Sequence, residues 1–185
     1  VTMDEAIDSI DAAVVSAQPG HNFGFANANT LNFAFDNSAF KTALNSFDAV
    51  FGDGVGVGVA SKFYGTPAID NVNGTDLLPF LCSRCSEKEY TLYLLGAKPG
   101  VAERMKSQLQ KVYPRLRIVG CRHGYFDRGR ENETVIDEIN KSGADILLVA
   151  MGVPEQELWL RENHDRLKCP VRIAVGGLFD FYSGD

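Results

Sequence analysis

The sequence has no long hydrophobic run and few of the residues that bind metals. No stretch approaches the ~20 consecutive apolar residues of a membrane-spanning helix, and the N-terminus lacks the basic and then apolar layout of a signal peptide. Among four cysteines and three histidines, only Cys82 and Cys85 form a CxxC pair, and no second pair or nearby histidine completes a zinc site. We therefore expect these thiols to be small buried hydrophobes, and we predict a soluble, intracellular protein that uses no metal and no cofactor.

Positive charge is also scarce. The 185 residues include 18 Lys and Arg against 24 Asp and Glu, a formal net charge of −6. Such a chain repels nucleic acid and anionic lipid as a whole, so we predict no nucleic-acid partner and expect any phosphate recognition to be local. With 45% hydrophobic residues, its length and composition fit one domain with a sizeable core.

Two glycine motifs are absent although glycine is abundant. The stretch Val50–Ala60, VFGDGVGVGVA, lacks the GxGxxG dinucleotide fingerprint because valine stands at 57 and 59. A P-loop is excluded too, because Arg130 and Glu131 follow the pair Gly124 and Gly129 where Lys and a hydroxyl residue are needed. The same stretch holds a single carboxylate, Asp53. Burying it is costly without a partner, so it either faces water at a turn or belongs to a site.

Strand and helix patterns alternate through the second half of the chain. We predict strands over 90–95, 116–120, 145–150 and 171–175, with helices over 99–112, 131–141 and 154–163. This spacing is typical of right-handed βαβ crossovers, which build a parallel sheet covered on both faces.

The first half is less regular. We predict helices over 2–17, 31–45 with a break near 36–37, 54–64 and 75–81, and short extended pieces over 23–26 and 49–51. The predicted fold class is α/β, with a Rossmann-like, mostly parallel sheet, helices on both faces and an N-terminal lobe of helices and short strands. We expect one domain over 1–185, its lobe reaching about residue 86 and its βαβ half beginning at about 87.

Ligands of open parallel sheets bind beyond the carboxyl ends of the strands, which directs attention to four loops. Gly96–Gly100 is a glycine turn before a helix start, where backbone N–H groups bind phosphate, although ordinary βα turns look the same. The loop over 121–126 carries Arg122, His123, Gly124 and Tyr125. It is either a nucleotide-base site or a solvated loop with its aromatic rings in the core.

The loop over 152–157 and the helix that follows it form the most specific of these stretches, and Gly52–Gly54 holds Asp53. Gln156 and Glu157 stand in the first turn of the helix, where they either hydrogen-bond a sugar or uracil edge or complement the helix dipole. We expect Trp159 to pack against the sheet. Asp53 has its own structural alternative, as an N-cap of the following helix.

Five motifs in this order resemble one known family. They are Asp53, GAKPGVAE (96–103), HGYF (123–126), GxPxQExW (152–159) and VGGLFD (175–180). From about residue 2 to its end the chain resembles the WecG/TagA/CpsF family of bacterial glycosyltransferases. The resemblance implies a compact Rossmann-like fold and metal-independent transfer, with inversion, of an N-acetylmannosamine-type sugar or related hexose from a UDP-sugar. The acceptor it implies is a polyprenyl-diphosphate-linked saccharide at the cytoplasmic face of the plasma membrane, in teichoic acid, capsule or exopolysaccharide synthesis.

The same resemblance implies residue roles. Asp53 is the general base, although Gly52 replaces the family's proline, and Asn29 and Asn27 are catalytic, with Asn27 standing where relatives often have threonine. Asn71 and Asp76 are acceptor-binding. Since Asn71 replaces the family's arginine, a different donor or acceptor sugar is expected. The donor-binding residues are expected to be Gly96, Lys98, Arg122, His123, Gly124, Tyr125, Gly152, Gln156 and Glu157.

Family members usually continue into a basic C-terminal extension that binds the membrane, and the chain begins at Val1 and ends at Asp185 before such a segment. We therefore expect a truncated, weakly active protein, peripheral at the membrane, whose uncovered apolar surface favours self-association into a homo-oligomer. Two other classes stay open. One is a nucleotide-binding module without turnover, and the other is an NAD-dependent oxidoreductase, which the missing glycine fingerprint disfavours.

Overall fold

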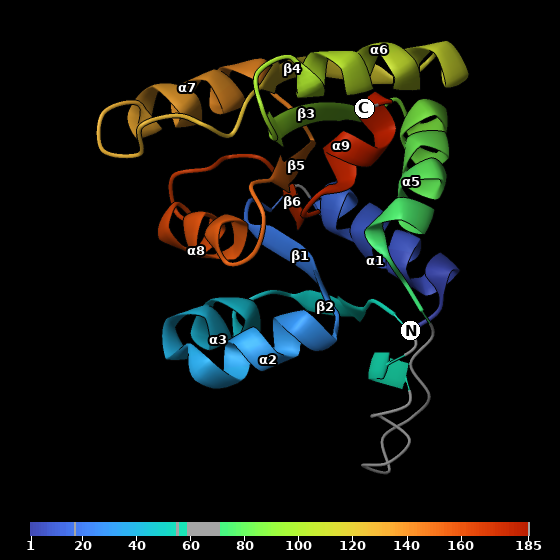
Figure 1. The fold of residues 1–185 in the computed structure, drawn as a ribbon. Coiled ribbons are helices and arrows are strands. Elements are labelled where there is room, and N and C mark those ends of the chain that lie inside the picture. The colour runs from blue at the N-terminus through green and yellow to red at the C-terminus, as the bar shows by residue number, and fades with distance from the viewer. Residues whose placement is uncertain (17, 55, 59–70, 185) are drawn as a thin grey trace.

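The computed structural model describes residues 1–16, 18–54, 56–58 and 71–184. Its centre is a six-stranded sheet in the order β2-β1-β6-β5-β3-β4, in which every neighbouring pair is parallel (Figure 1). The strands are β1 His21–Ala26, β2 Ala49–Gly52, β3 Thr91–Gly96, β4 Arg117–Arg122, β5 Ile146–Ala150 and β6 Val171–Ala174. The predicted parallel α/β sheet is confirmed. Strands from both halves of the chain share it, because β1 pairs with β6.

Helices cover both faces of this sheet, as predicted. One apolar cluster holds side chains of α1 Met3–Ser16, α5 Gly74–Lys88, α6 Val101–Val112 and α9 Leu178–Ser183. The other holds side chains of α7 Asn132–Ser142 and α8 Glu155–Glu162. Figure 1 shows α1 and α5 on one side of the sheet and α8 on the other.

The central strands β3 and β5 are mostly apolar because each face of the sheet is buried. Along β3, Leu92 and Leu94 enter the first cluster while Tyr93 and Leu95 enter the second. Successive side chains of a strand point to opposite faces, so a continuous apolar run is what a strand covered on both sides requires.

The predicted helix over 31–45 is two helices, α2 Ala28–Asp36 and α3 Ser38–Asn45. Asn37 separates them. Its backbone N–H donates to the carbonyl of Phe33, and its side chain accepts from the N–H of Phe40, so it ends one helix and caps the next. The predicted break near 36–37 is therefore confirmed.

Helix α5 is longer than the predicted helix over 75–81. Asn73 caps its start, and it continues past Pro79 to Lys88 with Cys82 and Cys85 fully buried on its apolar side. Proline cannot donate a hydrogen bond to the carbonyl of Thr75. The hydroxyl of Tyr182, from α9, donates to that carbonyl instead, at 2.8 Å. Most of the predicted helix over 54–64 lies outside the described residues.

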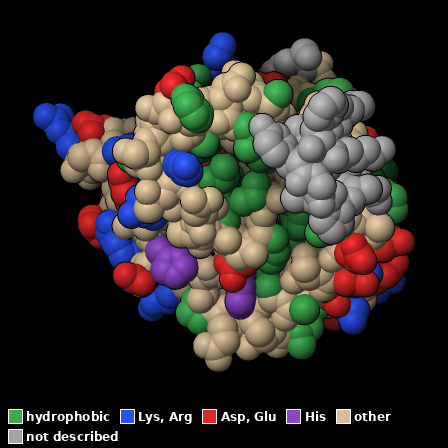
Figure 2. All heavy atoms as spheres, turned by 90° about the horizontal axis from the view of Figure 1, so that it is seen from below, with side chains coloured by type: hydrophobic (Ala, Val, Ile, Leu, Met, Phe, Trp, Pro, Cys, Tyr) green, Lys and Arg blue, Asp and Glu red, His purple; other side chains and the backbone are tan. Residues whose placement is uncertain are grey.

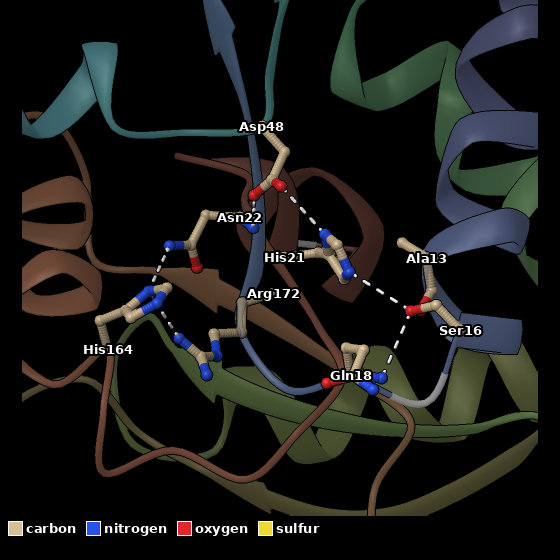
Figure 3. A network of polar contacts seen from close by, with 8 residues as sticks. All are labelled: Ala13, Ser16, Gln18, His21, Asn22, Asp48, His164 and Arg172. Atoms are coloured by element: carbon tan, nitrogen blue, oxygen red, sulfur yellow. Dashed lines mark hydrogen bonds and ion pairs between the residues drawn. The ribbon is translucent and has the colours of Figure 1, made fainter.

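A polar network holds the amino ends of strands β1 and β6, where these strands begin (Figure 3). Arg172 of β6 is fully buried and donates to the carbonyl of Leu167 at 2.6 Å. Its guanidinium and the amide of Asn22 both approach Nδ1 of His164, and the N–H of Asn22 donates to Asp48. Burial lowers the pKa of Arg172. This network joins β1 and β6 to the chain after α8, away from the carboxyl ends of the strands.

Candidate functional site

Two adjoining pockets lie at the carboxyl edge of the sheet. The first, of about 380 Å³, opens between the loops after β3 and β5. The chain leaves β3 toward β4 on one side and leaves β5 toward β6 on the other, so this is the point where the direction of winding reverses. We call it the switch-point pocket; it is lined by Ala97, Lys98, Gly124, Tyr125, Arg128, Ala150, Met151, Gly152, Glu155, Gly176, Gly177 and Asp180.

The second pocket, of about 530 Å³, lies beside β1, β2 and β6. We call it the Asp53 pocket; it is lined by Phe25, Asn27, Thr30, Asp53, Asn73, Gly74, Thr75, Gly152, Val153, Gln156, Ala174, Val175, Gly176, Gly177, Leu178 and Phe181. Three glycines, Gly152, Gly176 and Gly177, line both pockets. A ligand can therefore extend from one pocket to the other over backbone that carries no side chains.

Main chain packs closely behind the wall of the switch-point pocket, where the predicted donor-binding residue Gly96 lies without lining either pocket itself. Gly96 has φ +148°, and a Cβ there would lie 2.3 Å from the carbonyl oxygen of Ala150, so no other residue fits. The N–H of Ala97 donates to that same carbonyl at 2.7 Å, and the N–H of Gly124 donates to the carbonyl of Ala97 at 2.9 Å. These contacts hold the ends of β3, β4 and β5 together, and a ligand here meets main chain.

The predicted cation Arg122 is engaged elsewhere. One guanidinium nitrogen lies 2.8 Å from both carboxylate oxygens of Glu138, and the other lies 3.1 Å from Glu131. Arg122 lines neither pocket, nor does the predicted His123. Lys98 lines the switch-point pocket as predicted, and Arg128 joins it there. Tyr125 also lines it, with 69% of its side chain exposed.

Gln156 connects α8 to the turn after β6. Its side-chain oxygen accepts from the N–H of Gly176 at 2.9 Å, and its amide nitrogen donates to Glu157 at 2.8 Å. Gln156 lines the Asp53 pocket, whereas Glu157 lines neither pocket and is 1% exposed. Burial raises the pKa of Glu157 to about 7, and among the described residues its second carboxyl oxygen has no hydrogen-bond partner.

Asp53 stands directly after β2, half-buried in the wall of its pocket. Its N–H donates to the carbonyl of Ala26 at 2.9 Å, and its carboxylate accepts from the amide of Asn27 at 3.4 Å. The side-chain oxygen of Asn27 caps α2 by accepting from both the N–H and the hydroxyl of Thr30, at 3.0 and 3.1 Å. The cap therefore orients Asn27 so that its amide nitrogen points at the Asp53 carboxylate.

The other predicted acceptor and catalytic residues flank the Asp53 pocket. Asn29 is exposed in the first turn of α2. Asn71 accepts from the N–H of Gly54 at 2.7 Å, which holds the loop after β2. Asp76 and Asn73 bond each other at the start of α5, at 2.7 and 2.8 Å. Neither pocket is lined by Asn29, Asn71 or Asp76, whereas Asn73 lines the Asp53 pocket.

Several lining residues were not predicted from the sequence, namely Thr30, Asn73, Thr75, Arg128, Asp180 and Phe181. A local signal existed for Thr30 and Asn73, because each belongs to an N-cap pair with the usual spacing, Asn27 with Thr30 and Asn73 with Asp76. Asp180 ends the motif VGGLFD, although no site role was assigned to it. Arg128 and Phe181 had no signal, because only the packing of their loop and of α9 brings them to the pockets.

Charge on the visible surface is mixed. On the face seen in Figure 2, basic and acidic side chains are interspersed around the edge, and hydrophobic side chains lie in a hollow near the middle. In the described part of the chain, no group of three or more His, Cys, Asp or Glu side chains is placed to hold a metal ion. Nor does that part contain a helix long and apolar enough to cross a membrane.

The comparisons with known proteins agree on one family. The model of the glycosyl transferase WecG/TagA/CpsF family matches residues 1–185. The N-acetylglucosaminyldiphosphoundecaprenol N-acetyl-beta-D-mannosaminyltransferase of Bacillus spizizenii is 30% identical over 174 residues, which are 94% of this chain and 63% of that protein. The protein of the same name from Staphylococcus aureus (strain NCTC 8325) is 30% identical over 159 residues, 86% of this chain and 61% of its own. The chain thus spans less than two thirds of the length of these relatives.

Proposed function

Since the chain belongs to the WecG/TagA/CpsF family of glycosyl transferases, we propose that it transfers an N-acetylmannosamine-type sugar, or a related hexose, from a UDP-sugar to a polyprenyl-diphosphate-linked saccharide. The names of its relatives specify N-acetylmannosaminyl transfer to N-acetylglucosaminyldiphosphoundecaprenol. The observation that carries the proposal is the pair of pockets joined across Gly152, Gly176 and Gly177, with Asp53 in the wall of one. They offer neighbouring places for a nucleotide and for a reacting sugar.

The UDP moiety occupies the switch-point pocket in this proposal. Its volume of about 380 Å³ falls within the ~300–1,000 Å³ typical of small-molecule sites. The small lining residues Ala97 and Gly124 allow close approach of a diphosphate, Lys98 supplies positive charge, and the exposed ring of Tyr125 offers a surface for the base. Gln156 then holds the Gly176 turn against which the sugar lies.

Asp53 acts as the general base. The acceptor hydroxyl gives its proton to the Asp53 carboxylate while its oxygen forms a bond to the anomeric carbon. The bond from that carbon to the diphosphate oxygen breaks, its electron pair leaves with UDP, and the single displacement inverts the configuration. Asn27 donates to Asp53, so we assign it a positioning role. Lys98 and the backbone N–H groups around Gly152 stabilise the charge on departing UDP.

The place of action follows from the proposed acceptor. A polyprenyl-linked saccharide stays in the membrane, so the enzyme works at the membrane surface, and we propose the cytoplasmic face of the plasma membrane. The membrane contact that the family resemblance assigns to a C-terminal extension stays a prediction, as do self-association and the altered sugar specificity inferred from Asn71.

Calorimetric titration with UDP, with NADH as the control, is the first test. We expect saturable binding of UDP and none of NADH; the reverse would replace the transferase by an oxidoreductase. A transfer assay with UDP-N-acetylmannosamine and a polyprenyl-diphosphate-linked N-acetylglucosamine follows, with and without EDTA. Transfer that survives EDTA is the expected result, while tight UDP binding without any transfer would favour a nucleotide-binding module.

A further inference from the structure

Charges of both signs line the switch-point pocket. Its charged side chains are Lys98 and Arg128 against Glu155 and Asp180. A bound diphosphate adds several negative charges, so the positive side chains decide whether it is held. Arg122 is not available for this, because Glu131 and Glu138 already occupy its guanidinium. Of the two cations that line the pocket, Lys98 and Arg128, only Arg128 carries a planar guanidinium group, which can bind two phosphate oxygens at once.

Arg128 is held across the pocket by an exposed ion pair. Its guanidinium lies 2.8 Å from the carboxylate of Glu155, and the two side chains are 37% and 54% exposed. A second nitrogen lies 3.8 Å from the sulfur of Met151, another lining residue. Exposed ion pairs contribute little to stability. Exchanging Glu155 for a diphosphate therefore costs little.

Both partners tolerate the exchange. Glu155 stands in the first turn of α8, where the helix dipole stabilises a carboxylate without Arg128. The loop that carries Arg128 is held by other contacts, since the N–H of Asp127 donates to Glu131 and the N–H of Gly129 donates to Asp127, each at 2.8 Å. The arginine can thus change partner while its backbone stays in place.

We propose that Arg128 is a phosphate-binding residue of the switch-point pocket, which leaves Glu155 for the diphosphate of the bound donor and so sets the preference for a nucleoside diphosphate over an uncharged nucleoside. The proposal rests on the proposed function, because it assumes that UDP binds in this pocket. It makes Glu155 a competitor of the ligand, which gives the two side chains opposite effects on affinity.

Calorimetry with UDP and with uridine on four variants tests this. We expect R128Q to weaken UDP binding about tenfold, R128K to weaken it less, and E155Q to tighten it about threefold, as expected when a charge-assisted hydrogen bond is lost or a competing charge removed. Uridine binding should stay within about twofold in each variant, since no phosphate is present. Arg130 is the matched control: it is 89% exposed in the same loop and lines neither pocket, so R130Q should bind UDP as the wild type does.

The outcomes separate the two proposals. If the wild type binds UDP and R128Q binds it equally tightly, the role of Arg128 is overturned while the donor site stands. Loss of UDP and uridine affinity together in R128Q, with a lowered melting temperature, would also overturn it, because it would show a structural role. If the wild type binds neither compound, the donor site itself is wrong and the Arg128 proposal is lost with it.

Discussion

The buried carboxyl of Glu157 should make the stability of the protein depend strongly on pH. Burial raises its pKa from 4.5 to about 7, which corresponds to about 3 kcal/mol between folded and unfolded protein. The folded state keeps Glu157 protonated longer than the unfolded state does, so its contribution is fully present below about pH 4.5. That contribution is lost as the pH rises toward 7 and is absent above it.

The variant E157Q removes this titration and keeps an oxygen that can accept from the amide of Gln156. Urea unfolding at pH 5, 6, 7 and 8 should show that the free energy of unfolding of the wild type falls by about 2 to 3 kcal/mol relative to that of E157Q over this range, since part of the contribution is already lost at pH 5. E162Q is the matched control, because Glu162 is an exposed residue of the same helix; its curve should run parallel to the wild type. Parallel curves for the wild type and E157Q would refute the assignment of the pH dependence to Glu157.

Three further substitutions test the site and its support. D53N should lower the rate of transfer by ~10²–10⁴-fold with UDP affinity unchanged; a wild-type rate in the transfer assay would remove Asp53 from the chemistry. N27A should lose the cap of α2, at about 1 kcal/mol in urea unfolding, and should also slow transfer because Asp53 loses its amide partner; an unchanged rate would leave Asn27 a purely structural cap. Y182F should cost about 1 kcal/mol, since the carbonyl of Thr75 opposite Pro79 then has no donor, and equal stability to the wild type would show that water replaces the hydroxyl.

Much of the fold was predictable because its signals are local. Strand and helix periodicity over 90–175 predicted β3 to β6 and the helices between them, since buried strands and amphipathic helices differ in the spacing of apolar residues. Asn37 marks the break between α2 and α3 by the same local logic of side-chain caps. The predicted helix over 75–81 already passed Pro79 but stopped short of Lys88, where α5 ends. The hydroxyl that compensates for the missing donor of Pro79 comes from residue 182, which no local pattern indicates.

The candidate site was predictable as a set of loops but not as a set of side chains. The rule for parallel sheets selected the loops after β2, β3, β4 and β5. These loops contribute to both pockets, but the segments after β1 and β6, which were not selected, supply much of the Asp53 pocket. Within one of these loops the rule cannot choose between Arg122 and Arg128. Arg122 ends β4 and faces the carboxylates of α7, whereas Arg128 reaches across to the start of α8.

The sequence by itself determined the strands and most of the helices, although not α9, and where several of them begin, because these depend on neighbours within a few residues. The tertiary structure alone decided that β1 lies beside β6, that α9 brings Asp180 and Phe181 to the pockets, and which arginine lines the switch-point pocket. These contacts join residues that are far apart in the chain. They form only when the whole sheet and its covering helices pack together, so no local pattern encodes them.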